Sequence, residues 1–219
     1  MSEASMTGAV LDDLVRRHPA LAACRESINA AYAMLTGALA AGGTIFVCGN
    51  GGSRADADHI VGELSKGFLS RRPLPAATIR EFSARLGEDA APLCARLQRG
   101  LRAMLLDAHP ALTTAYANDV DPLMACAQQL FVMGRPGDAV IGISTSGNAA
   151  NVANVFKVAA GIGARRLLLT GNRHGACEAL AELSITVPEA ETYKVQELHL
   201  PVYHALCIML EKRFFGDGD

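Results

Sequence analysis

Tryptophan is absent from this sequence of 219 residues, and aromatic side chains make up only 5% of it. The 20 basic and 22 acidic residues are mixed along the chain, so it lacks the runs of like charge that are typical of nucleic-acid or membrane-surface binding segments. No apolar stretch approaches the ~18 uninterrupted residues that a membrane-spanning helix needs, and no secretory signal pattern opens the sequence. These absences predict a cytoplasmic protein that binds neither nucleic acid nor a membrane.

The six cysteines form no C-x-x-C pair, which argues against a structural zinc site built from thiolates. Most of them lie inside apolar runs, where cysteine behaves as a small hydrophobic residue. We therefore expect reduced thiols in the core. The residues concerned are Cys24, Cys48, Cys94, Cys126, Cys177 and Cys207.

Half of the residues are hydrophobic, which at this length is enough to bury one sizeable core, so we expect a single domain over 1–219. Two helical patterns, 7–17 and 19–41, indicate an N-terminal helical region over 1–42. After it, short apolar runs alternate with segments of helical periodicity, which is typical of βα units around a parallel sheet. The predicted strands are 44–49, 103–108, 138–144, 165–171 and 183–188. These runs are nearly all apolar, as strands covered on both faces should be. The sequence therefore predicts an α/β fold, a three-layer αβα sandwich with a five-stranded parallel sheet.

Two regions depart from this simple alternation. Segment 69–102 contains prolines followed by two short helical patterns, and we interpret it as an inserted helical cap beside the ligand site. The last predicted helix, 191–215, has apolar residues on all its faces. Such a helix is expected to pack against more than its own sheet, which indicates an oligomer.

Two predicted strand-to-helix loops are suited to binding a phosphate group. They are "NGGS" at 50–53 and "STSGN" at 144–148, and ligands of open parallel sheets bind beyond the carboxyl ends of the strands, where helix N-termini attract anions. Glycines allow a tight turn and close approach, and hydroxyls bond to phosphate oxygens. The alternative is that the serines only cap helices. Dinucleotide and triphosphate loops are disfavoured, because Arg54 stands where G-x-G-x-x-G requires glycine.

A histidine and a glutamate follow the first loop on one helix face. His59 and Glu63 are four residues apart, so their side chains lie one turn apart on the same side of the helix. Polar residues also gather in the otherwise apolar final helix, where the sequence reads "QELHLPVYH". A surface contact is the alternative for His59 and Glu63, but buried polar groups need partners, and these two segments offer them to each other.

The ordered motifs "CGNGGSRADADHIVGEL", "GISTSGN", "LTG" and "VQELHLPVYH" resemble the sugar isomerase (SIS) fold and, within it, the phosphoheptose isomerases. The resemblance covers about 43–215 with one interruption. It implies interconversion of sedoheptulose 7-phosphate and D-glycero-D-manno-heptose 7-phosphate through an enediol. It also implies a homotetramer whose active sites lie between subunits.

Carried over residue by residue, the resemblance implies that Glu63 and His204 are the acid–base pair, since a carboxylate and an imidazole suit proton transfer near neutral pH. It implies a Zn²⁺ ion surrounded by His59, Glu63, Gln196 and His204. The implied contacts of the phosphorylated seven-carbon sugar are Asn50, Gly51, Gly52, Ser53, Asp119, Ser144, Thr145, Ser146 and Gln196.

The sequence departs from the family pattern at several places. Ala149 stands where the family often has a further serine, Lys66-Gly67-Phe68 replaces an arginine–aromatic pair, and Tyr193-Lys194 replaces Asp-Arg. The exact sugar therefore stays open. A non-catalytic SIS module that grips a protein partner or senses a sugar phosphate is the alternative to an enzyme, and turnover of sedoheptulose 7-phosphate with and without a chelator distinguishes the two.

Overall fold

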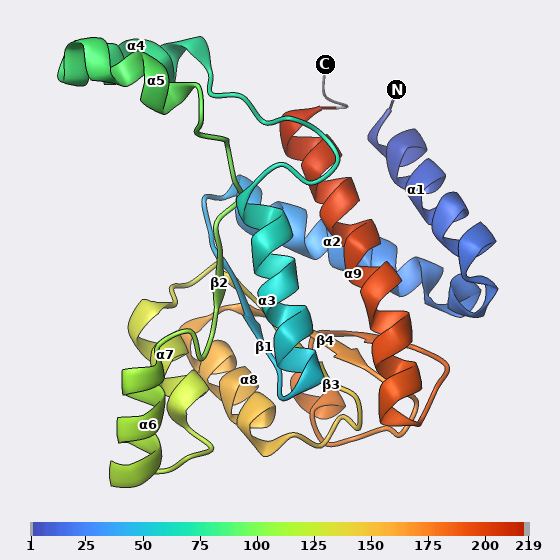
Figure 1. Ribbon diagram of the computed structural model, residues 1–219. Helices are drawn as coiled ribbons and strands as arrows, with labels where there is room; N and C mark the ends of the chain where they lie inside the picture. The colour runs from blue at the N-terminus through green and yellow to red at the C-terminus, as the bar shows by residue number, and fades with distance from the viewer. Residues whose placement is uncertain (1, 217–219) are drawn as a thin grey trace.

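The computed structural model describes residues 2–216 and contains one five-stranded parallel sheet with the strand order β2-β1-β3-β4-β5 (Figure 1). Its strands are β1 (Ile45–Cys48), β2 (Ala103–Leu105), β3 (Ala139–Ser144), β4 (Arg165–Thr170) and β5 (Leu183–Thr186). Each lies inside one of the predicted runs, and β2 is shorter than its run. The predicted α/β fold is therefore confirmed.

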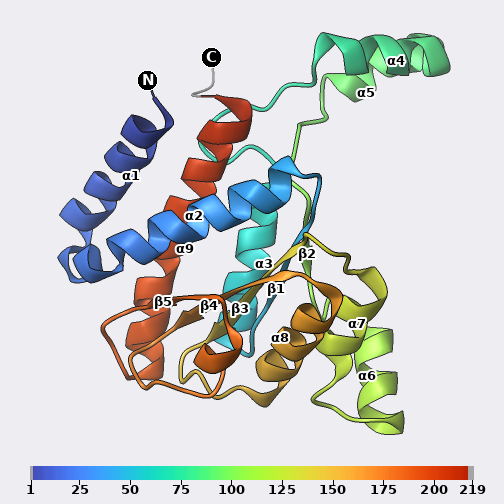
Figure 2. The ribbon, with the colours of Figure 1, turned by 180° about the vertical axis from the view of Figure 1, so that it is seen from behind.

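Helices cover both faces of the sheet, which is why its central strands are mostly apolar; β4 begins with two arginines at its less buried end. The helices are α1 (Glu3–Arg17), α2 (Arg25–Ala40), α3 (Gly52–Ser65), α4 (Ala76–Leu86), α5 (Ala90–Cys94), α6 (Pro110–Asp119), α7 (Ala125–Met133), α8 (Ala150–Ile162) and α9 (Thr192–Phe215). Figures 1 and 2 show α2, α3 and α9 on one side of the sheet and α7 and α8 on the other. Alternate residues of β1 divide accordingly: Ile45 and Val47 belong to the core under the first group, and Phe46 and Cys48 to the core under the second.

The N-terminal helices differ from the prediction at their starts. The Ser2 hydroxyl accepts a hydrogen bond from the Ser5 amide (3.2 Å), so α1 is capped there and begins at Glu3, earlier than predicted. The second predicted helix does not run unbroken from Pro19. A 3-10 turn over Pro19–Cys24 comes first, and α2 begins at Arg25.

Helix α9 is enclosed by helices of its own chain. It packs against α1, α2 and α3, and its buried residues include Val195, Val202 and Met209. The helix thus packs against more than its own sheet, as expected, while Tyr193 and Leu200 stay 57% and 40% exposed. The oligomer stays a prediction.

Segment 69–102 forms a helical hairpin, α4 and α5, that projects from the body at the C-terminal end of α3 (Figure 1). No residue of α4 is buried. Hydrogen bonds join the residues that precede α4 to those that follow α5. The Arg99 amide donates to the Arg72 carbonyl (2.8 Å), and the Gly67 amide donates to the Gln98 side chain (2.8 Å). The hairpin thus lies at the opposite end of α3 from loop 50–53, and it does not cover that loop in its own chain.

All six cysteines are buried and free, as predicted. Within residues 2–216, no helix combines the length and the apolar composition that crossing a membrane requires.

Candidate active site

The two predicted phosphate-binding loops lie side by side at the carboxyl ends of β1 and β3. The side-chain amides of Asn50 and Asn151 exchange two hydrogen bonds of 2.8 Å, which tie the first loop to the start of α8. Gly51 has φ +53°, a conformation that favours glycine, and the helix begins at the next residue. Ser53 is 4% exposed, so its hydroxyl sits inside the turn.

The second loop is held by its own hydroxyls and by a neighbouring segment. Ser144 Oγ accepts from the Ala149 amide (3.3 Å) and Ser146 Oγ from the Asn148 amide (3.2 Å), so these serines do brace the start of α8. A hydroxyl that accepts in this way still has its own hydrogen to donate to an anion. The capping interpretation and the phosphate interpretation are therefore compatible. Thr145 is half-buried in the same loop, and its carbonyl accepts from the Gly171 amide (3.2 Å).

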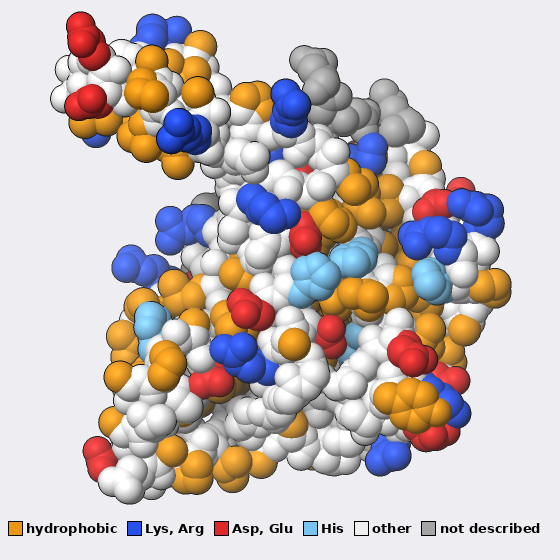
Figure 3. All heavy atoms as spheres, in the orientation of Figure 1, with side chains coloured by type: hydrophobic (Ala, Val, Ile, Leu, Met, Phe, Trp, Pro, Cys, Tyr) orange, Lys and Arg blue, Asp and Glu red, His pale blue; other side chains and the backbone are white. Residues whose placement is uncertain are grey.

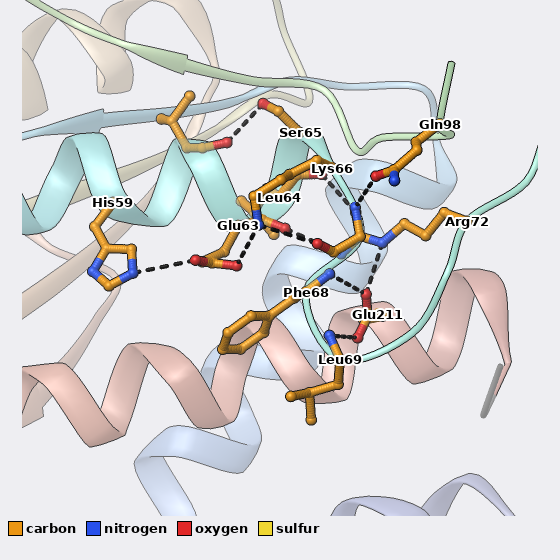
Figure 4. A network of polar contacts seen from close by, with 12 residues as sticks. His59, Glu63, Leu64, Ser65, Lys66, Phe68, Leu69, Arg72, Gln98 and Glu211 are labelled. Atoms are coloured by element: carbon orange, nitrogen blue, oxygen red, sulfur yellow. Dashed lines mark hydrogen bonds and ion pairs between the residues drawn. The ribbon is translucent and has the colours of Figure 1, made fainter. Parts of the chain in front are cut away.

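His59, Glu63 and His204 come together where α3 lies against α9. Nε2 of His59 is 3.2 Å from Oε1 of Glu63, and Nζ of Lys66 is 3.3 Å from Oε2, as Figure 4 shows. The His59 and His204 rings meet edge to face with centroids 5.0 Å apart. Glu63 and His204, the expected acid–base pair, thus both contact His59 within one chain. Figure 3 shows histidine side chains at the surface on this face, beside an acidic side chain.

The electrostatic surroundings favour a neutral His204. Burial lowers its pKa, and the positive charge of a protonated His59 lowers it further, while the Glu63 carboxylate acts in the opposite direction. Its Nε2 atom is buried and has no hydrogen-bond partner. The Phe68 ring packs on the same imidazole, with centroids 5.3 Å apart. A neutral imidazole is suited to exchange a proton near neutral pH.

Sequence reasoning missed two side chains that contact His59 or its neighbours. Nδ1 of His59 lies 3.0 Å from the hydroxyl of Tyr203, and that hydroxyl donates to Oδ1 of Asp56 (3.2 Å). Burial, and then the Asp56 carboxylate, raise the pKa of Tyr203, so the phenol keeps its proton at neutral pH. Asp56 stands three residues before His59 on α3, a spacing that places both on one face and was the available signal.

The expected metal ligands are only partly assembled. His59, Glu63 and His204 are neighbours, but the Gln196 side chain lies against Gly52 at the first residue of α3, where an added Cβ would come within 2.5 Å of its Nε2. Across residues 2–216, no group of three or more His, Cys, Asp or Glu side chains is arranged to hold a metal ion. The side chains as placed in one chain therefore do not form a zinc site.

Asp119 stands apart from the other predicted site residues. It is the exposed last residue of α6, and its carboxylate accepts from the neighbouring Asn118 side chain (2.8 Å). Within the described part of the chain, no hydrogen bond or ion pair joins Asp119 to either phosphate-binding loop or to Glu63.

A buried ion pair fixes the backbone that follows Glu63 (Figure 4). Arg72 donates to the Glu211 carboxylate (2.8 Å) and also to the carbonyls of Leu64 (2.8 Å) and Glu63 (3.1 Å). Glu211 in turn accepts from the amide of Phe68 (2.8 Å). The ion pair therefore anchors the end of α3, which carries Glu63, to α9, which carries His204.

Comparison with known proteins agrees with this geometry. A family model described as the SIS domain matches residues 14–89. A phosphoheptose isomerase from Geotalea daltonii is 36% identical over 190 residues, which cover 87% of this chain and 85% of that protein. One from Akkermansia muciniphila is 32% identical over 197 residues, with 90% of each chain covered.

A solved structure shows the same fold. The phosphoheptose isomerase from Neisseria gonorrhoeae superposes with a TM-score of 0.72 at 26% identity, over 96% of this chain and 100% of that one. The likeness therefore spans the whole domain, including the N-terminal helices and α9. On the strength of these relatives, the chain belongs to the phosphoheptose isomerase family.

Proposed function

We propose that this protein is an aldose–ketose isomerase that converts sedoheptulose 7-phosphate to D-glycero-D-manno-heptose 7-phosphate. The observation that carries the proposal is the meeting of Glu63 and His204 around His59 within one chain. The relatives named phosphoheptose isomerase, at 36% and 32% identity over most of the chain, support the same substrate class. A binding module has no need for an acid–base pair held this way.

The reaction moves one proton between two adjacent carbons. A base removes a proton from the carbon next to the ketose carbonyl, while an acid protonates the carbonyl oxygen, which gives the enediol. Return of a proton to the former carbonyl carbon, with loss of one from the neighbouring hydroxyl, gives the aldose. Glu63 and His204 are assigned these two tasks, because a carboxylate and a neutral imidazole both exchange protons near neutral pH.

The phosphate end of the sugar is assigned to the two loops. Ser53, Ser144, Thr145 and Ser146 supply hydroxyls, and the starts of α3 and α8 supply backbone amides that favour an anion. Asn50 and Asp119 are assigned to sugar hydroxyls and Gln196 to the substrate beside Gly52. These loops bind the sugar in the same way before and after proton transfer, so they contribute mainly to affinity.

Zinc, a homotetramer and a cytoplasmic location belong to the proposal as well. The zinc ligands would be His59, Glu63, Gln196 and His204, although in one chain the Gln196 side chain lies against Gly52 at the start of α3. A metal analysis of the purified protein decides this point: about one zinc per chain supports the ligand set, and an active protein without metal rejects it. The free, buried cysteines are compatible with a reducing compartment.

Substitution of the acid–base pair tests the function. We expect Glu63→Gln and His204→Ala each to lower kcat for sedoheptulose 7-phosphate by at least about 100-fold, since positioned acid–base groups contribute on that scale. The assay detects the aldose product by NMR, with and without chelator, and circular dichroism verifies that both variants stay folded. Near-normal turnover by either variant removes the mechanism. A wild-type protein inactive on several phosphosugars favours the non-catalytic binding module instead.

A further inference from the structure

The hydroxyl of Tyr203 bridges two groups of α3 from its position on α9. It donates to Oδ1 of Asp56 at 3.2 Å and lies 3.0 Å from Nδ1 of His59. Tyr203 is 1% exposed, whereas the His59 side chain is 42% exposed, so the hydroxyl holds the ring from its buried side.

The single hydrogen of the Tyr203 hydroxyl determines which group donates in each of its two hydrogen bonds. A phenol has one hydrogen and two acceptor sites. Since Tyr203 gives its hydrogen to Asp56, Nδ1 of His59 must carry the hydrogen of the second bond and donate it to the phenol oxygen. A carboxylate only accepts, so the 3.2 Å contact of Nε2 with Glu63 is a hydrogen bond when His59 is an imidazolium with a hydrogen on each nitrogen. The two bonds together then fix the rotation of the ring.

We propose that Tyr203 and Asp56 are positioning residues, which hold the His59 ring so that Nε2 stays against Glu63 and keeps that carboxylate in place for proton transfer. Neither residue needs to touch the sugar. In other proteins, a residue that hydrogen-bonds to the second ring nitrogen of a functional histidine orients that ring in the same way. The activity part of this inference rests on the proposed isomerase function.

Tyr203 also contacts both histidines through its ring. The His59 and Tyr203 rings are 5.5 Å apart at 74°, and the Tyr203 and His204 rings are 5.0 Å apart at 85°. A phenylalanine at this position keeps both contacts and loses only the hydroxyl. Tyr203→Phe therefore separates orientation by hydrogen bonding from packing.

Tyr32 supplies the matched control. It is 4% exposed, and its hydroxyl donates to Glu3 (2.6 Å), where α2 meets α1. We expect Tyr203→Phe to lower kcat about 10-fold to 100-fold, with KM for sedoheptulose 7-phosphate within about twofold of the wild type. Tyr32→Phe keeps both constants. A wild-type kcat in Tyr203→Phe, or an equal loss in both variants, overturns the positioning role.

A second measurement does not depend on turnover. In protein labelled with ¹⁵N-histidine, the wild type should show a hydrogen-bonded Nδ1 proton on His59, assigned by its loss in His59→Asn. Tyr203→Phe should lose this signal and Tyr32→Phe should keep it. An active wild type without the signal overturns the positioning role. An inactive wild type that shows it supports the positioning and rejects the isomerase proposal, so the two failures are distinguishable.

Discussion

Two histidines of α9 differ in how much water reaches them. His204 is half-buried at the candidate active site, whereas His199 is 0% exposed beneath it. Burial lowers the pKa of His199 to about 4 from its ordinary 6.5. A single helix thus carries one imidazole at the candidate active site and another that stays neutral above about pH 4.

The enclosed His199 makes stability depend on pH. Between pH 6.5 and about 4 the unfolded chain binds a proton at this residue and the folded chain does not, so acidification through this window favours unfolding. The loss reaches the order of 3 kcal/mol by the lower end, at about 1.4 kcal/mol for each pKa unit. Urea denaturation at a series of pH values should show this slope in the wild type and a shallower one in His199→Gln. Equal slopes in both proteins contradict the assignment.

At the scale of the elements, the helices and strands were accessible from the sequence because each has a local signal. The runs around Ile45 and Ile141 are apolar over a strand's length, and the segment that ends at Phe215 is apolar over a length that favours a helix. The break at Pro19–Cys24 was missed, because a proline is equally suited to the first turn of a 3-10 segment and of an α-helix.

The contacts between elements had no such local signal. Tyr203 meets His59 and Asp56 across 144 and 147 residues of sequence, and Arg72 meets Glu211 across 139. Which residues of α3 face α9 depends on how the two helices cross, and the sequence does not specify that angle. The grouping of Glu63 with His204 was predicted through resemblance to a family, whereas the role of Tyr203 required the three-dimensional arrangement.

The buried ion pair between Arg72 and Glu211 should dominate the stability of the α3–α9 contact. Their side chains are 0% and 2% exposed, so Glu211→Gln leaves a buried guanidinium without its counter-charge. Loss of one partner of a buried pair typically costs about 3 to 5 kcal/mol. We expect urea denaturation at pH 7 to show a loss of this size. Glu182→Gln, which disrupts the more exposed pair with Arg165, should cost about 1 kcal/mol or less.

The Glu211 carboxylate also makes stability depend on pH, and its contribution is lost in stronger acid than that of His199. Burial alone would raise the pKa of Glu211, but hydrogen bonds from the Phe68 and Leu69 amides and from Arg72 outweigh burial and lower it below its ordinary 4.5. Its contribution is therefore complete above pH 4.5 and is lost as the pH falls through the lowered folded-state pKa. The stability difference between wild type and Glu211→Gln should accordingly shrink only in stronger acid. A difference that is constant down to acid unfolding contradicts this.

At the scale of the whole molecule, the hairpin of α4 and α5 is nearly independent of the sheet and its cores. Its helices pack mainly on each other, through buried Ala90 and Cys94, and no residue of α4 is buried. The hairpin exposes large apolar side chains, among them Leu86 and Leu93, which are each 44% exposed. Neither the domain core nor the contacts among His59, Glu63 and His204 include a residue of these two helices.

Excision of the hairpin tests that independence. Because Arg72 and Arg99 are joined by a backbone hydrogen bond, a short glycine linker can replace 74–97 without moving either end. We expect a thermal midpoint within about 4 °C of the wild type, since few core contacts are lost. Light scattering should give four times the chain mass for each protein, with 23.0 kDa per chain in the wild type and a smaller chain in the variant, because the proposed tetramer does not depend on the hairpin. Dissociation of the shortened chain to smaller species instead places the subunit contacts on the exposed leucines of the hairpin.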